Sequence, residues 1–119
     1  MRRVLIVDDD PDLLEMVCLM VSSSDMKPLC VSSGDQAIQA ISREHFDLIV
    51  MDIYLGQHDG RELARQLKAD PKFAAIPILL YSAGHISPDS IYRSKADGFI
   101  QKPFEMPDLL SRMRSMMAV

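Results

Sequence analysis

Five short apolar runs alternate with amphipathic segments along the chain, and this alternation limits the possible folds more than any other feature. The runs occupy residues 3–7, 27–31, 47–51, 76–81 and 98–101. Four of them lack the polar alternation of a half-exposed strand, which is typical of strands covered on both faces. The last run is shorter and weaker, so it fits an edge or near-edge strand.

The segments between the runs carry the start signals of helices. Pro11 follows Asp10, Pro88 follows Ser87, and Pro107 opens the last segment. Proline is favoured at the first helical position, and Asp10 is expected to be the N-cap of its helix. One strand followed by one helix, five times over, predicts an α/β fold. Its sheet should be parallel, with right-handed crossovers and helices on both faces.

Length and composition narrow the class of protein further. A chain of 119 residues is expected to form one domain, residues 1–119. Apolar residues make up 48% of it, which excludes a disordered chain, and no apolar run approaches the roughly 18 residues of a membrane span. The net charge of -4 argues against direct nucleic-acid binding by this chain. Cys18 and Cys30 lie in apolar segments without metal-site spacing, so we expect unpaired core residues in a reducing compartment.

Polar side chains stand at the carboxyl ends of four of the five apolar runs. Asp8 and Asp9 follow the first run, Asp52 the third, Ser82 the fourth and Lys102 the fifth. In an open parallel sheet, ligands bind in the crevice beyond these strand ends. The sequence therefore predicts that three carboxylates, a hydroxyl and an ammonium converge there.

This set of groups suits phosphoryl transfer. Three neighbouring carboxylates repel one another, and a hard divalent cation with oxygen ligands, Mg²⁺ above all, would offset that repulsion. Lys102 adds a compact positive charge. Positioned charges of this kind stabilise a phosphoryl group in transfer, and a carboxylate can serve as its acceptor.

Four motifs carry a resemblance to a known family: VLIVDDD (4–10), LIVMDIYLGQHDG (48–60), ILLYSAG (78–84) and ADGFIQKPF (96–104). In this order and at these spacings, the whole chain resembles the receiver domain of two-component response regulators. The resemblance implies a doubly wound, flavodoxin-like (βα)5 fold. Its five-stranded parallel sheet should have the strand order 2-1-3-4-5.

The resemblance also implies a role for each residue of the predicted crevice. Asp52 would accept a phosphoryl group from the phosphohistidine of a sensor histidine kinase or from a phosphotransfer protein. Asp8, Asp9 and Asp52, with the backbone carbonyl of Tyr54, would bind Mg²⁺. Lys102 would pair first with Asp52 and then with the phosphoryl group.

Four residues around this crevice match further positions of the family pattern. Ser82 would hydrogen-bond a phosphoryl oxygen, and Phe99 would switch with it. Ala83 is small, as access to the phosphoryl group requires. The peptide bond before Pro103 is expected to be cis. The face made by the fourth helix, fifth strand and fifth helix would then carry the output.

Three residues depart from the family pattern. Gly56 stands where a proline is frequent, Tyr54 is bulky at a position that influences phosphoryl lifetime, and Ser82 replaces the commoner threonine. The resemblance implies a cytoplasmic signalling domain that acts on no external substrate, catalysing only its own phosphorylation and dephosphorylation. It should be a monomer or weak dimer, with no role at a membrane.

Two other functions remain open. VLIVDDD also resembles the first motif of haloacid-dehalogenase-like phosphatases, in which Asp8 would be the nucleophile and Asp10 the acid. The short chain and the unexplained Asp52 argue against that enzyme. A receiver-like interaction module that is never phosphorylated is the second alternative. His45, His58 and His85 lack metal-site spacing, and we expect no catalytic role for the last two.

Overall fold

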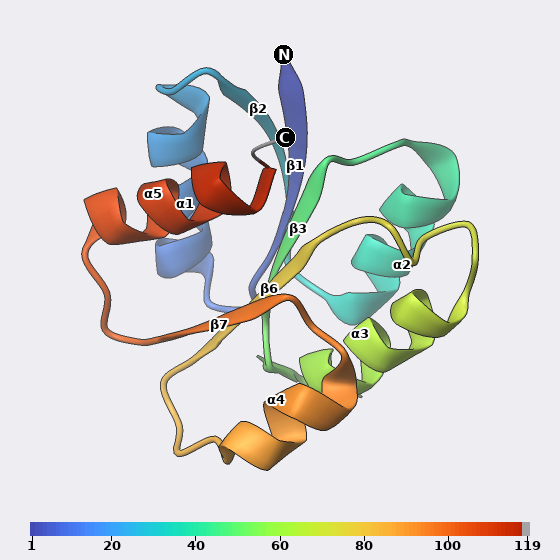
Figure 1. Cartoon of the computed structure of the whole chain (residues 1–119). Coiled ribbons are helices and arrows are strands. Elements are labelled where there is room, and N and C mark those ends of the chain that lie inside the picture. The colour runs from blue at the N-terminus through green and yellow to red at the C-terminus, as the bar shows by residue number, and fades with distance from the viewer. Residues whose placement is uncertain (118–119) are drawn as a thin grey trace.

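A five-stranded parallel sheet forms the centre of the molecule. The computed structural model describes residues 1–117, and its main sheet has the order β2-β1-β3-β6-β7 (Figure 1). These strands are β1 (Arg2–Val7), β2 (Met26–Val31), β3 (Leu48–Asp52), β6 (Ile78–Ser82) and β7 (Gly98–Gln101). Counted along the chain, they give the order 2-1-3-4-5, so the predicted α/β fold is confirmed.

Helices cover both faces of this sheet and divide the core into two layers. Two of them, α1 (Pro11–Ser22) and α5 (Met106–Met117), pack on one face (Figure 1). The other face is covered by α2 (Gly34–Arg43), α3 (Gly60–Ala69) and α4 (Pro88–Ser94). Neighbouring strand residues point to opposite layers, so both layers need apolar side chains. This explains the unbroken apolar runs in the sequence.

The start signals read from the sequence act as predicted. The Asp10 carboxylate accepts hydrogen bonds from the amides of Asp12 and Leu13, and the Ser87 hydroxyl accepts one from the amide of Ser90. Two strands differ from the predicted ranges in a way that concerns function. Because β3 and β6 run one residue further than predicted, Asp52 and Ser82 are the last residues of their strands.

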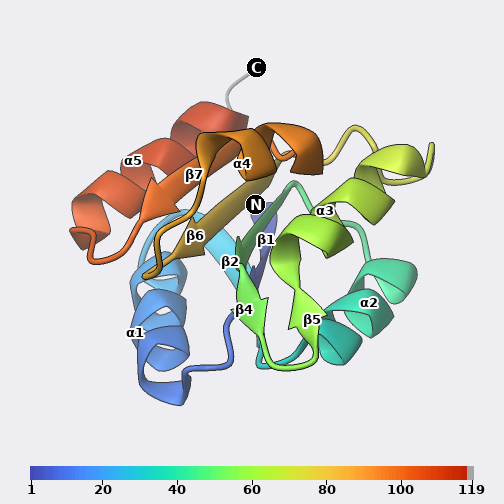
Figure 2. The ribbon, with the colours of Figure 1, turned by 90° about the horizontal axis from the view of Figure 1, so that it is seen from below.

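A small hairpin after β3 was not predicted. Its strands are β4 (Tyr54–Leu55) and β5 (His58–Asp59), which pair antiparallel (Figure 2). Gly56 lies in the turn with a φ of 64°, a conformation that glycine adopts without steric cost. The glycine in place of the family's frequent proline therefore has a structural reason here. The hairpin also joins β3 to α3, whose N-cap is Asp59.

The expectation of unpaired cysteines is wrong, and these two residues therefore do not support a reducing compartment. Cys18 on α1 and Cys30 on β2 form a disulfide, with their Cα atoms 6.3 Å apart. The helix packs directly on this edge strand, and that brings two half-buried side chains face to face. Neither spacing nor composition reveals such a tertiary contact. Among residues 1–117, the structure has no helix long and apolar enough to cross a membrane.

Reduction of this disulfide should lower the free energy of unfolding by about 2–3 kcal/mol, because the bridge restricts the unfolded chain between Cys18 and Cys30. Urea unfolding with and without dithiothreitol measures the effect. The Cys18→Ala/Cys30→Ala double variant is the control, since its unfolding should not respond to reductant. Alkylation of both thiols in the folded, unreduced protein would contradict the disulfide.

Candidate functional site

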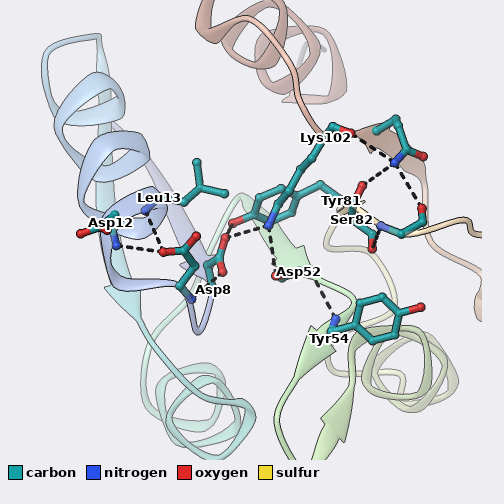
Figure 3. Close-up of polar contacts among 11 residues, drawn as sticks. Asp8, Asp12, Leu13, Asp52, Tyr54, Tyr81, Ser82 and Lys102 are labelled. Atoms are coloured by element: carbon teal, nitrogen blue, oxygen red, sulfur yellow. Dashed lines mark hydrogen bonds and ion pairs between the residues drawn. The ribbon is translucent and has the colours of Figure 1, made fainter.

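The polar residues predicted from the strand ends gather at one edge of the sheet (Figure 3). Asp8 follows β1, Asp52 ends β3, Ser82 ends β6 and Lys102 follows β7. Asp8, Asp52 and Ser82 are buried, although each carries a polar side chain. Burial of such groups is costly unless they are paired or hydrogen-bonded. Their side-chain contacts therefore define the site.

Lys102 links two of the carboxylates. Its Nζ lies 3.2 Å from Oδ2 of Asp52 and 3.4 Å from Oδ2 of Asp8, and its own side chain is largely buried. The backbone holds the same carboxylates from the other side, because the amide of Asp10 donates to Oδ1 of Asp8 and the amide of Tyr54 donates to Oδ1 of Asp52. Both carboxylates are thus oriented by at least two donors.

Asp9 completes a cluster of three acids. One oxygen each from Asp8, Asp9 and Asp52 can be chosen so that all three lie within 4.8 Å of one another. Asp9 is exposed, whereas the other two are buried. The three carboxylates are close to a single ammonium group, that of Lys102. The cluster therefore retains negative charge and offers three oxygen ligands to a cation.

The pKa of Asp52 reflects this excess of negative charge. The pKa of its carboxyl group is raised to about 6, mainly by burial and further by the charge of Asp8, against the opposing effect of Lys102. The lysine therefore does not offset the cost of holding an ionised carboxylate at this position. A second positive charge close to Asp52 would favour its ionised form.

Tyr81 belongs to the site and was missed in the sequence. Its hydroxyl donates a hydrogen bond of 2.6 Å to Oδ2 of Asp8, and its ring centroid lies 4.6 Å from Nζ of Lys102. Burial and the neighbouring Asp8 charge raise the pKa of its phenol, so the hydroxyl remains a donor. Tyr81 lies in the aliphatic strand β6, where the apolar pattern suggested only core packing.

Ser82 is placed next to the site, and its carbonyl is held by the following strand. Its Oγ accepts a hydrogen bond of 3.2 Å from the amide of Gly84. The carbonyl of Ser82 accepts from the amide of Lys102 and from the side chain of Gln101, which also reaches the carbonyl of Gly84. Gln101 is a second residue of the site that the sequence did not reveal. Its side chain links the loop after β6 to β7.

The remaining predicted residues lie around this centre. Ala83 is exposed and, with Lys102, lines an open groove between the start of α1 and the loop before α5. Phe99 is partly buried against the layer under α2, α3 and α4. Tyr54 is half exposed, with its ring close to Gly84. The peptide bond before Pro103 is cis, as expected.

Comparison with known proteins decides the family. The family model described as the response regulator receiver domain matches residues 4–114. The chain belongs to this family. It is therefore a receiver domain of two-component signalling, and receiver domains of this family are signalling modules rather than classical enzymes.

Individual relatives agree with this assignment. The DNA-binding response regulator MtrA of Mycolicibacterium smegmatis is 31% identical over 116 residues, covering 96% of this chain and 50% of that protein. A solved structure described as a response regulator from Chloroflexus aurantiacus has a TM-score of 0.92, 30% identity and coverage of 99% and 98%. The signal receiver domain of a histidine kinase from Syntrophus aciditrophicus has a TM-score of 0.89, 28% identity and coverage of 99% and 91%.

The chain spans about half the length of the curated relatives it matches. Receiver domains thus occur beside different partners: one of these relatives is a DNA-binding regulator, and another is part of a kinase. What the relatives share with this chain is the receiver domain.

Proposed function

We propose that this receiver domain is a phosphoacceptor switch in which Asp52 receives the phosphoryl group. The observation that carries the proposal is the Asp52 carboxylate, which ends a buried strand with the Lys102 ammonium 3.2 Å away. A carboxylate at a sheet edge can act as a nucleophile, and a neighbouring ammonium can stabilise charge on the transferred group.

The three-acid cluster supports Mg²⁺ as the cofactor of this reaction. Hard cations prefer carboxylate oxygens, and the oxygens of Asp8, Asp9 and Asp52 are close enough to share one ion. The backbone carbonyl of Tyr54 would be a fourth protein ligand. When bound, Mg²⁺ would supply positive charge to the phosphoryl oxygens.

Residues of the chain itself would carry out the transfer. An Asp52 oxygen attacks the phosphorus of a phosphohistidine, an O–P bond forms, and the P–N bond breaks with its electron pair leaving on the imidazole, which takes up a proton. Lys102 then pairs with the phosphoryl group. Ser82 donates a hydrogen bond to one of its oxygens, and the small Ala83 leaves room for the donor. Attack of water on the phosphorus later breaks the bond to the Asp52 oxygen, releases inorganic phosphate and regenerates the carboxylate.

The output would arise on the face formed by α4, β7 and α5. Ser82 and Phe99 would move toward the phosphoryl group, and α4 would then change its position or stability. This helix is weakly anchored, because Ser94 is the one buried residue among its seven, Pro88–Ser94. Amide exchange with and without beryllofluoride, a phosphoryl mimic, tests this step. We expect changed exchange in α4, β7 and α5, and unchanged exchange there would contradict it.

The partners and compartment follow from the same proposal. The phosphoryl donor would be a sensor histidine kinase or a phosphotransfer protein. A cytoplasmic location is supported by the DNA-binding relative, because such a regulator works where DNA is. We propose residues 1–119 as a single receiver domain, of which residues 118–119 lie outside the described part. We also propose a monomer or weak dimer that itself binds neither nucleic acid nor membrane.

The test is covalent labelling by acetyl phosphate, a small phosphoryl donor that needs no kinase. We expect one phosphoryl adduct per chain when Mg²⁺ is present and none when the metal is removed with EDTA. The intact mass of the protein measures the adduct. No adduct with either acetyl phosphate or beryllofluoride would favour the interaction module that works without phosphorylation.

A further inference from the structure

The buried hydroxyl of Tyr81 has a function that core packing does not require. Phenylalanine would fill the same volume in β6, yet the chain places a phenol whose Oη lies 2.6 Å from Oδ2 of Asp8. Both residues are fully buried. A polar group is retained in such a place when it satisfies another polar group that water does not reach.

Tyr81 contacts the charged cluster at two points. Its hydroxyl bonds Asp8, and the face of its ring lies beneath the ammonium of Lys102, with Nζ 4.6 Å from the ring centroid. Figure 3 shows the Tyr81 ring beside Lys102, with the Tyr81 hydroxyl next to Asp8. Cations are attracted to the electron-rich face of an aromatic ring. The same side chain therefore fixes one negative and one positive group of the site.

The ring itself is held in place by its surroundings. Phe104 packs edge-on against it, with ring centroids 5.8 Å apart, and the Tyr81 carbonyl accepts a hydrogen bond from the amide of Ile53. Tyr81 also pairs in register with Asp52 in the neighbouring strand. The hydroxyl is thus presented to Asp8 from a rigid position.

We propose that Tyr81 is a positioning residue of the metal site, whose hydroxyl fixes Asp8 in the orientation that supports Mg²⁺ and whose ring supports Lys102. This rests on the proposed function, since it takes the acidic cluster as the Mg²⁺ site. Groups that orient metal ligands from behind typically contribute 10–100-fold to metal affinity.

Calorimetric titration with Mg²⁺ alone tests the proposal. Tyr81→Phe, which removes only the hydroxyl, should lower the affinity about tenfold, and Tyr81→Leu, which also removes the ring, should lower it further. Tyr92→Phe is the matched control, because Tyr92 lies on α4 with 70% of its surface exposed and is not part of the acidic cluster. Its affinity should equal that of the wild type.

A double-variant cycle separates positioning from a general structural effect. If Tyr81 acts through Asp8, then Tyr81→Phe should change the affinity less than about twofold in an Asp8→Asn background. An equal loss in both backgrounds would overturn the proposal, and so would wild-type affinity in Tyr81→Phe. These two results leave the phosphoacceptor function standing, whereas failure of the wild type to bind Mg²⁺ would overturn both.

Discussion

Replacing Asp52 by asparagine should abolish the phosphoryl adduct while leaving the fold intact. Asparagine has nearly the same shape, and its carbonyl oxygen can still accept the hydrogen bond from the amide of Tyr54. It lacks the anionic oxygen that would attack phosphorus. Labelling by acetyl phosphate and Mg²⁺, followed by intact mass, measures the loss. Persistence of an adduct in Asp52→Asn would show that another group is the acceptor.

The same variant should be more stable than the wild type at neutral pH without metal. Burial raises the pKa of Asp52 to about 6, so the folded state binds its proton more tightly than the unfolded state does. The contribution of Asp52 to stability is therefore largest at low pH and is lost as the pH rises from about 4 to about 6. In EDTA at pH 7.5, the rise of this pKa from 3.8 to about 6 corresponds to about 3 kcal/mol at roughly 1.4 kcal/mol per pKa unit, so Asp52→Asn should be more stable by about that amount.

Urea unfolding at two pH values checks the direction of this stability difference. The difference between the wild type and Asp52→Asn should be present at about pH 7.5 and should nearly disappear at about pH 3, where Asp52 is largely protonated in both the folded and the unfolded state. Equal stabilities at the higher pH would contradict the raised pKa. A stable Asp52→Asn protein would also show that loss of labelling is not caused by unfolding.

Replacing Gly60 by alanine should destabilise the protein by about 3 kcal/mol and impair labelling of Asp52. A Cβ atom at Gly60 would overlap the carbonyl oxygen of Asp52 and would lie 3.1 Å from Cα of Ile53. These are backbone atoms at the end of β3, so no side chain can rotate away. The amide of Gly60 also donates to the carbonyl of Ile53. Relief of the overlap must therefore move the segment that carries Asp52.

Two other glycines serve as controls for this effect. At Gly98 a Cβ would meet only movable side-chain ends, beginning with Leu79 Cδ1 at 3.3 Å, so Gly98→Ala should change stability little. Gly56 has open space around it but a φ of 64°, so Gly56→Ala should cost about 1 kcal/mol. Urea unfolding of the three variants measures the order of their losses in stability. A loss in Gly60→Ala no larger than in Gly98→Ala would contradict the close approach.

The sequence alone predicts most of this fold because its signals are local. Unbroken apolar runs mark the strands, and proline after Asp10 and Ser87 marks the helix starts. The hairpin after β3 escaped prediction because its strands have two residues each, too short for a period of two to appear. The disulfide escaped because it depends on how α1 packs on β2.

The candidate site could be predicted to the same extent. Asp8, Asp52 and Lys102 stand out as charged residues after apolar runs, and parallel strand ends must meet at one edge. Tyr81 could not be recognised in this way, since a tyrosine in a strand is ordinarily a packing residue. Only the position of its hydroxyl against Asp8 separates it from the other core residues of β6.

Locating the phosphoryl group in the chain tests directly whether Asp52 carries it. After labelling with acetyl phosphate and Mg²⁺, borohydride reduces an acyl phosphate of aspartate to homoserine, which peptide mass spectrometry identifies. We expect homoserine at position 52 and unmodified aspartate at positions 8, 9 and 10. Homoserine at position 8 would contradict Asp52 as the acceptor and favour the phosphatase alternative.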